Sequence, residues 1–354
     1  MTGAWVARAV ATAVGLGVLD RLGEGPADTA ALADKLGLHP ERLGRLLRLL
    51  AAAGVVRERD GLHEPTDVGS HLRRGHPSGM ADLALLYDTD MFGHAWGHLA
   101  DTVRTGRTAF EQAHGTGVFP YLEQHPDEAA LYTAGMAAGG RFSTAVPDVY
   151  DFGGARTVVD LGGGDGELLA TVLAGAPDAH GVLVERPPAL AAARERLGAF
   201  VDAGRCELVE GDFLREVPGG ADVYLLSRVL HNWSDGDARR LLRLCRESMA
   251  PDGRVLVAER ILPDRDGPWL SLVLDVHMMV MTTGAERTER GYEELLRSAG
   301  LTTREILDLP LEMRLLVAGP VPVVPGTAAR RSGPRTAAPV TSARGGSATD
   351  SPGH

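Results

Sequence analysis

Several features that mark whole classes of protein are scarce or absent in this sequence. The 354 residues include only two cysteines, Cys206 and Cys245, too few for a disulfide framework, and no C-x-x-C spacing of the kind that binds zinc. No apolar run approaches the length of about eighteen residues that a membrane span needs. The first residues, Met1–Trp5, lack the basic segment of a secretory signal. We therefore expect a cytoplasmic protein without a membrane partner.

An excess of basic charge is also absent. The formal net charge is −11 at pH 7, whereas a general nucleic-acid-binding protein carries basic patches. The last stretch, Val321–His354, carries four arginines against one aspartate and is crowded with proline, glycine, serine, threonine and alanine. Such a composition buries too little apolar surface to order a chain. We predict a disordered tail at residues 320–354 and no nucleic-acid partner.

A dinucleotide-binding fingerprint is missing from the glycine-rich stretch Val158–Glu167, which reads V-V-D-L-G-G-G-D-G-E. An apolar run, a glycine turn and a helical segment together open a nucleotide-binding βαβ unit. The pattern G-x-G-x-x-G counted from Gly162 would need glycine at position 167, where Glu167 stands. The stretch instead reads G-x-G-x-G with Asp160 just before it. This resembles the first motif of S-adenosylmethionine (SAM)-dependent methyltransferases, although glycine clusters also make ordinary tight turns.

Residues 1–150 are predicted to form a mainly helical domain. Apolar residues recur at helical intervals over Ala4–Leu22, Asp28-Thr29 caps a second helix, and His39-Pro40 begins a third. Asp60-Gly61 then marks a hairpin, so these elements resemble a winged helix. Such a module often binds DNA, but acidic residues interrupt its arginines. We favour a dimerising module and keep a winged-helix transcriptional regulator as the alternative.

The helical pattern continues from Gly79 to about Tyr150. We predict an amphipathic helix through Met91–Val103, a looser glycine-rich segment over Phe110–Leu122, and one long helix over Asp127–Tyr150 that Pro147 kinks. The large apolar side chains of this region suit a pocket for a flat ring system. The pocket residues expected from it are Trp96, Phe110, Phe119, Met136 and Phe142.

Residues 151–319 are predicted to form a second domain in which strands and helices alternate. Alternation of this kind gives a mostly parallel, doubly wound sheet with helices on both faces, an α/β, Rossmann-like fold. The expected strands are 157–161, 181–184, 206–209, 223–226 and 254–258, with two more near 303–308 and 313–318. The expected helices are 166–174, 189–197, 237–249, 269–281 and 289–299.

Polar residues follow each predicted parallel strand. In an open α/β sheet, ligands bind beyond the C-terminal ends of the strands, so these residues are expected around one site. Each also has a plain structural explanation; Glu185, for example, can form a surface pair with Arg186. A structural explanation must hold separately for every one of them, which favours a shared binding site. Besides the glycines, the residues are Glu185, Asp212, Phe213, Ser227, His231 and Glu259.

Short motifs of the second domain form a set. They are Asp160–Gly166, Glu185, Gly211–Phe213, Arg228–Asp235, Ala258–Leu262 and Gly284–Thr288. Together they resemble the small-molecule O-methyltransferases, which include plant caffeate and flavonoid enzymes and bacterial enzymes that methylate aromatic polyketides. The H-x-W-x-D pattern that starts at His231 is the most specific. The resemblance runs from near Gly3 to about Gly319 and implies SAM as cofactor and a homodimer formed by the N-terminal domain.

The resemblance also implies roles for individual residues. The histidine that matches His231 is the general base in that family, and the acids that match Glu259 and Glu286 orient it; no metal is expected. A histidine, with a reference pKa of about 6.5, suits the removal of a phenolic proton. The expected cofactor residues are Asp160, Gly162, Gly164, Glu185, Gly211, Asp212, Phe213, Ser227 and Arg228. The expected acceptor residues are Trp96, Phe110, Met136, Phe142, Asn232, Asp275 and Met278.

Two features affect which properties of the family are expected in this chain. The chain begins almost at Gly3, so a first helix that relatives use in dimer exchange is expected to be short or absent. Some bacterial relatives keep SAM yet hydroxylate or decarboxylate an aromatic polyketide, and such a relative can lack the histidine. The presence of His231 favours methylation. The expected function is SAM-dependent methyl transfer to a hydroxyl of an aromatic, polyketide-type secondary metabolite.

Overall fold

The computed structural model describes residues 2–138, 141–263, 265 and 268–322. Residues up to Val321 form one compact unit, and the boundary between two domains near residue 150 remains a prediction. The predicted disordered tail lies outside the described residues from residue 323 onward. Within the described part, no helix is both long enough and apolar enough to cross a membrane.

The fold centres on an eight-stranded sheet whose main path is β5-β4-β3-β6-β7-β10-β9, with β8 paired to β7. Strands β5 to β7 along this path are parallel, and β10 is antiparallel to both β7 and β9. The predicted α/β class with a mostly parallel sheet is confirmed. The strands are β3 (Thr157–Leu161), β4 (His180–Glu185), β5 (Cys206–Glu210), β6 (Val223–Ser227), β7 (Arg254–Leu262), β8 (Arg287–Thr288), β9 (Leu301–Leu309) and β10 (Met313–Pro320).

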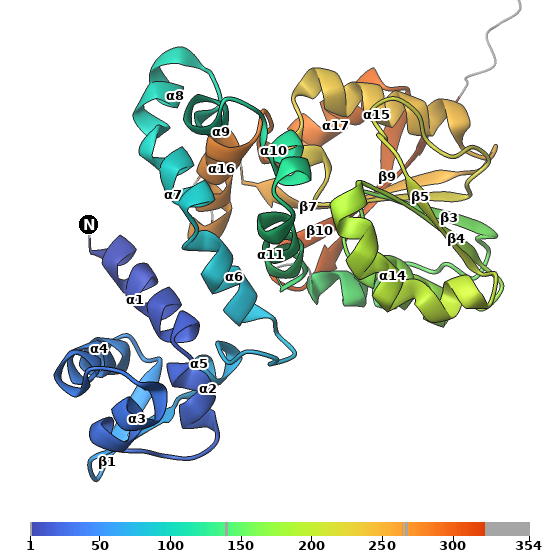
Figure 1. Ribbon diagram of the computed structural model, residues 1–354. Coiled ribbons are helices and arrows are strands. Elements are labelled where there is room, and N and C mark those ends of the chain that lie inside the picture. Colours follow the sequence, from blue (N-terminus) through green and yellow to red (C-terminus); the bar gives the residue numbers. More distant parts are fainter. Residues whose placement is uncertain (1, 139–140, 264, 266–267, 323–354) are drawn as a thin grey trace, which may run out of the picture. The chain divides into compact units, whose positions relative to one another are not determined.

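Both faces of the sheet are buried under helices, which is why its central strands are almost uniformly apolar. In β3, Val158 packs into the core on one face, while Val159 and Leu161 pack into the core on the other. Figure 1 shows α14 on one side of the strands and α15 and α17 on the other. The covering helices are α13 (Glu167–Gly175), α14 (Pro187–Asp202), α15 (Asp235–Ser248) and α17 (Glu289–Ser298).

The N-terminal region contains the predicted helices and hairpin, with one correction. Asp28 caps α3 by accepting a hydrogen bond from the Ala31 amide at 2.8 Å, and β1 pairs with β2 across Asp60-Gly61. The single helix predicted over residues 4–22 is wrong, because Gly17 adopts a left-handed φ of 72° and separates two helices. The elements are α1 (Gly3–Gly15), α2 (Val18–Gly23), α3 (Thr29–Leu36), α4 (Pro40–Ala52), β1 (Val56–Arg59), β2 (Leu62–Pro65) and α5 (Asp67–His71).

The helices from Met80 onward are shorter than predicted. The stripe through Met91–Val103 is interrupted at His98, and Val103 is 70% exposed rather than packed. The segment predicted as loose contains α9 and α10. The long helix over Asp127–Tyr150 is also wrong, since α11 ends at Ala138 and a 3-10 helix begins at Arg141. The elements are α6 (Met80–Tyr87), α7 (Asp90–Gly97), α8 (Leu99–Thr105), α9 (Ala109–His114), α10 (Val118–Gln124), α11 (Pro126–Ala138), η1 (Arg141–Ala145) and α12 (Val146–Val149).

Helix α16 (Trp269–Met281) joins the helical region to the sheet. It lies between β7 and β8 in the chain, yet it contacts α7, α8 and α9. Its Val280 and Met281 belong to the same buried cluster as Phe92 and Phe110. Helices from the first 150 residues and one helix from the second half of the chain therefore form a common wall beside the sheet.

Truncation after Pro322 tests the predicted tail. We expect an unchanged melting temperature, because β10 is complete at Pro320 and the Val321 amide already bonds the Gly300 carbonyl at 3.0 Å. Truncation after Pro310 is the contrast, since it removes a strand paired on both sides. Differential scanning fluorimetry separates the two. A large fall in melting temperature for the first variant would show that the tail contributes to the fold.

Candidate active site

A cavity of about 730 Å³ lies at the C-terminal ends of β3, β4, β6 and β7. Side chains and loops that follow these strands line one part of it. Helices α7, α10, α11 and α16 line the other part with mostly apolar and aromatic side chains. The cavity thus has a polar end over the sheet and an apolar end against the helices, as a site for a polar ligand and an apolar one would need.

The glycine turn after β3 forms part of the polar end. Gly162 and Gly164 adopt left-handed φ values of 73° and 61°, which disfavour other residues. A Cβ on Gly163 would lie 2.3 Å from Oδ2 of Asp160, so only glycine fits there. The Gly164 amide donates a 3.0 Å hydrogen bond to Oε2 of Glu185 at the end of β4. The turn therefore presents bare backbone beside two carboxylates.

Asp160 is an unpaired buried acid in the cavity wall. The residue is fully buried, and neither carboxylate oxygen has a hydrogen-bond partner within the described residues. Burial raises the pKa of Asp160 to about 8, and the charges of Glu185 and Asp165 add to the rise. An unpaired buried polar group costs about 1–3 kcal/mol, so a cationic partner here would bring a clear gain. SAM, which carries positive charges, fits these residues.

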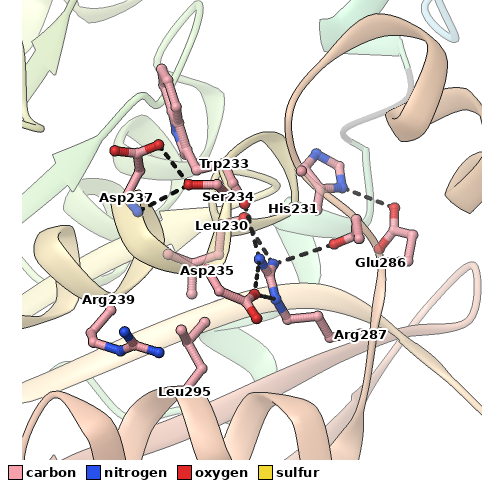
Figure 2. Close-up of polar contacts among 12 residues, drawn as sticks. Leu230, His231, Trp233, Ser234, Asp235, Asp237, Arg239, Glu286, Arg287 and Leu295 are labelled. Atoms are coloured by element: carbon pink, nitrogen blue, oxygen red, sulfur yellow. Dashed lines mark hydrogen bonds and ion pairs between the residues drawn. The ribbon is translucent and has the colours of Figure 1, made fainter. Parts of the chain in front are cut away.

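A cluster of three ionisable residues lies next to the glycine turn. His231 follows β6 in the 3-10 turn η2 (Leu230–Asn232), Glu259 lies inside β7, and Glu286 directly precedes β8. Nδ1 of His231 is 2.9 Å from Oε1 of Glu286 and 3.4 Å from Oε2 of Glu259 (Figure 2 shows the Glu286 contact). Oε1 of Glu259 also accepts the His231 backbone N–H at 3.2 Å. Both acids thus hold the histidine by its Nδ1 side.

The charges of this cluster favour a protonated imidazole. Burial alone lowers the pKa of His231, but the charges of Glu259 and Glu286 and the hydrogen bond to Glu286 outweigh it, so the pKa is raised. Burial raises the pKa of Glu259 to about 7. The charge of His231 lowers this pKa, and the charge of Glu286 raises it further. In the neutral ring, Nδ1–H is donated to a carboxylate and Nε2 is the nitrogen that holds a lone pair. The arrangement suits a base.

Family models match most of the chain. The O-methyltransferase domain matches residues 96–302, more than half of the sequence, and the O-methyltransferase dimerisation domain matches residues 1–74. The chain belongs to the O-methyltransferase family. It is a methyltransferase that uses SAM, the cofactor of this family, as predicted.

Individual relatives and solved structures agree with this assignment. The 3-amino-4-hydroxybenzoate 4-O-methyltransferase of Streptomyces cremeus is 40% identical over 90% of this chain and 88% of its own length. CalO1, a methyltransferase of calicheamicin biosynthesis solved with S-adenosylhomocysteine (SAH) bound, is 38% identical, with a TM-score of 0.79 over 90% of this chain and 96% of its own. Aclacinomycin 10-hydroxylase RdmB of Streptomyces purpurascens is 38% identical over 83% of this chain and 80% of its own length. Relatives of similar identity therefore differ in reaction.

The expected cofactor residues of this O-methyltransferase fall into two groups: some line the cavity and others do not. Gly211, Asp212 and Phe213 are not part of the cavity wall among the described residues. Asp212 is exposed and accepts the Leu214 amide at 3.0 Å, while Phe213 packs edge-on against Trp233 beneath the glycine turn. A role for these three in binding the cofactor stays a prediction. The residues that do line the cavity are Asp160, Gly162, Gly164, Glu185, Ser227 and Arg228.

Arg228 directly follows β6 and connects the sheet to the helical wall. It has a left-handed φ of 54°, which is unusual for a residue with a side chain, and its Nη2 donates to the Met136 carbonyl of α11 at 2.7 Å. Its guanidinium lies 5.8 Å from the Phe142 ring. Burial lowers the pKa of Arg228. This arginine, predicted as a cofactor residue, also fixes α11 beside the cavity.

The expected acceptor residues are divided between the cavity and the protein core. Phe110 and Phe142, fully buried, pack into separate apolar clusters, which corrects the prediction that they line the pocket. Asp275 is not among the described residues that line the cavity; its Oδ1 accepts the Glu286 amide at 3.1 Å, and burial raises its pKa. The residues that line the cavity are Trp96, Phe119, Met136, Asn232 and Met278.

Sequence reasoning missed His277 on α16. Its ring stacks on Phe92 at 5.4 Å and on Trp96 at 6.0 Å, and meets Tyr87 edge-on at 5.8 Å, in the apolar end of the cavity. Burial lowers the pKa of His277 to about 4, so the imidazole is neutral at pH 7. The only available signal was its position next to Met278 in an apolar helix, which does not distinguish a pocket residue from a core residue.

His231, Glu259 and Glu286 also have the composition of a metal site. One ligand-type atom from each lies within 4.8 Å of the others. At 2.9 Å, the contact between His231 and Glu286 has the length of a hydrogen bond between the two groups. The expectation of a metal-free site remains a prediction, and activity in the presence of EDTA is its check.

Asp160→Asn tests the unpaired acid at the polar end. The folded pKa of about 8 lies above the unfolded value of about 4, so the free protein loses stability as pH rises from 4 towards 8. We expect the variant to gain in melting temperature over the parent as the pH is raised from 5 to 8, and calorimetry to show SAM binding weakened at least tenfold.

The control for this experiment is Asp178→Asn, which changes an exposed carboxylate between α13 and β4. It should leave SAM affinity unchanged. If Asp160→Asn bound SAM as tightly as the parent, Asp160 would have no part in holding the cofactor.

Proposed function

We propose that this methyltransferase moves a methyl group to a hydroxyl of an aromatic small molecule and that His231 is the general base. The observation that carries the proposal is a histidine in the cavity wall whose Nδ1 hydrogen-bonds buried Glu286 and lies 3.4 Å from buried Glu259. Nε2 is then free to accept a proton from a hydroxyl placed in the cavity. Bound SAM supplies an electrophilic methyl group on a positively charged sulfur.

Each residue of the cluster has a part in the proton transfer. The carboxylate of Glu286 fixes the tautomer by accepting Nδ1–H, and Glu259 holds the turn through the backbone N–H of His231. As Nε2 takes the hydroxyl proton, both anions stabilise the imidazolium. The oxygen becomes a stronger nucleophile while the cavity holds it in place, and positioning supplies a large share of the rate.

The shape and chemistry of the apolar end support an aromatic acceptor. Phe92, Trp96, Phe119 and Met278 line it, and their flat or flexible side chains pack well against a ring. The name of the Streptomyces cremeus relative describes methylation of a hydroxyl on a benzene ring, which agrees with this acceptor class. RdmB is named as a hydroxylase, and the complete base cluster supports methyl transfer for this chain.

His231→Ala is the direct test of the base. SAM binding should stay nearly intact while the rate falls by roughly 10²–10⁴-fold, because positioning survives and proton removal does not. Glu259→Gln should lower the rate less than His231→Ala does, because the imidazole remains. The parent's rate should rise with pH through a value above about 6.5, because the pKa of His231 is raised and only neutral imidazole accepts a proton.

The acceptor for these assays must be a phenol of high pKa, since a phenol already ionised at the assay pH needs no base. A screen of phenols with labelled SAM, read by mass spectrometry, identifies it. Near-full methylation of such a phenol by His231→Ala would mean that proximity alone runs the reaction. His231 would then be a residue that positions the acceptor.

We propose that two copies of the chain associate through the N-terminal helices. The dimerisation model matches residues 1–74, and this part exposes large apolar side chains. These include Trp5 (72% exposed) on α1, Leu16 directly after α1, and Val68 on α5. A second copy would cover this surface.

Light scattering tests the association. The parent should have the mass of two chains at micromolar concentration. Trp5→Ser combined with Leu16→Ser should shift the measured mass towards that of one chain. Val103→Ser, an exposed apolar residue outside residues 1–74, is the control and should leave the mass unchanged. A parent with the mass of one chain would overturn the proposal.

A further inference from the structure

Arg287 lies beneath the turn that carries His231. The residue is 8% exposed, and its guanidinium donates from Nη1 to the Leu230 carbonyl at 3.0 Å and from Nη2 to the Trp233 carbonyl at 2.9 Å (Figure 2). Leu230 directly precedes His231, and Trp233 lies two residues after it. The arginine therefore holds the backbone of the turn on both sides of the proposed base.

The remaining donors of Arg287 are also used. Nη1 reaches the Ala285 carbonyl at 3.3 Å, and Nε and Nη2 reach Oδ1 of Asp235 at 2.9 and 2.8 Å. A guanidinium has five N–H donors in a rigid plane, and each has an acceptor here. A lysine ammonium has three donors and cannot reproduce this set. A side chain so fully engaged holds its acceptors at fixed mutual distances.

The segment that carries Arg287 also touches the rest of the cluster. Arg287 pairs in β8 with Ile261 of β7, two residues after Glu259, and it directly follows Glu286. Gly284 lies against the same turn, since a Cβ there would be 1.9 Å from the His231 carbonyl oxygen. One short stretch of chain therefore supports the turn, supplies one acid and attaches to the strand that supplies the other.

We infer that Arg287 is the positioning residue for His231: by binding the carbonyls of the turn, it keeps Nδ1 within hydrogen-bond distance of Glu286. This rests on the proposed role of His231 as base. Arg287 is not among the described residues that line the cavity, so its effect on the acceptor must pass through the histidine. Its charge also opposes the rise in the pKa of Glu259 that burial causes, which helps that acid stay ionised.

A double-mutant cycle separates positioning from general structural support. Arg287→Lys keeps the charge but loses part of the hydrogen-bond set, and we expect kcat to fall about 10- to 100-fold, the scale of a displacement near 1 Å. SAH affinity, measured by calorimetry, should change less than about twofold, because the glycine turn is on other strands. In a His231→Ala background the same substitution should cost less than about threefold, since the group it positions is gone.

The matched control is Arg290→Lys, an exposed arginine on the next helix that pairs with Glu294 at 3.6 Å. It should leave kcat unchanged in both backgrounds. Asp235→Asn is a second variant for the case that Arg287→Lys folds poorly. Its side chain is 73% exposed, so the fold should tolerate the change, and removing the charged partner of Arg287 should give a smaller loss of the same kind.

A readout that needs no turnover distinguishes this inference from the proposed function. In protein with ¹⁵N-labelled histidine, at a pH above the raised pKa of His231, the His231 signals, assigned by their loss in His231→Ala, should show one tautomer, protonated at Nδ1. Arg287→Lys should give a mixture of tautomers. An equal loss of kcat in both backgrounds, or an unchanged tautomer, would overturn the inference. Failure of the parent to methylate any phenol would instead count against the proposed function and leave the tautomer result to decide the positioning role.

Discussion

Two buried carboxylates that share one imidazole nitrogen set the requirements for the rest of the site. As anions, Glu259 and Glu286 repel each other in a poorly solvated place, and a proton on Nδ1 of His231 relieves that repulsion. The three groups come from the turn after β6, the interior of β7 and the start of β8. They meet only if those elements keep a fixed register. The pairing of β7 with β6, β10 and β8 supplies it, so the architecture of this sheet edge and the charge state of the histidine depend on each other.

The parts of the structure that depend on local sequence were predictable. Strand ranges, the glycine turn and the hairpin at Asp60-Gly61 follow from short-range patterns, and the structure has them close to where they were expected. The rule that ligands bind at the carboxyl edge of a parallel sheet led to Asp160, Glu185 and His231, which the structure brings to one cavity. The strand carrying Glu259 is longer than predicted, because β10 and β8 continue to pair with it beyond Ala258.

The parts of the structure that depend on tertiary packing could not be predicted from short-range sequence patterns. Phe110 and Trp96 have similar apolar character, yet one is in the core and the other in the cavity wall, and only the packing of α9 against α7 decides which. A helical pattern also survives a short interruption, so the breaks at Gly17 and His98 left no clear mark in the periodicity. Three acceptors of Arg287, on Leu230, Trp233 and Asp235, lie more than fifty residues earlier in the chain, a distance over which no local pattern carries information.

The position of α16 in the chain has an evolutionary consequence. The polypeptide leaves the sheet after Leu262, three residues beyond Glu259, contributes α16 to the helical wall, and returns to the sheet at β8, directly after Glu286. Recombination that exchanges this helix would therefore have its crossover points between the two acids. The polar end of the cavity around Asp160 and Glu185 is encoded about 70 to 100 residues before Glu259 and would be inherited intact. Lineages can in this way diversify the molecule they act on without rebuilding cofactor recognition.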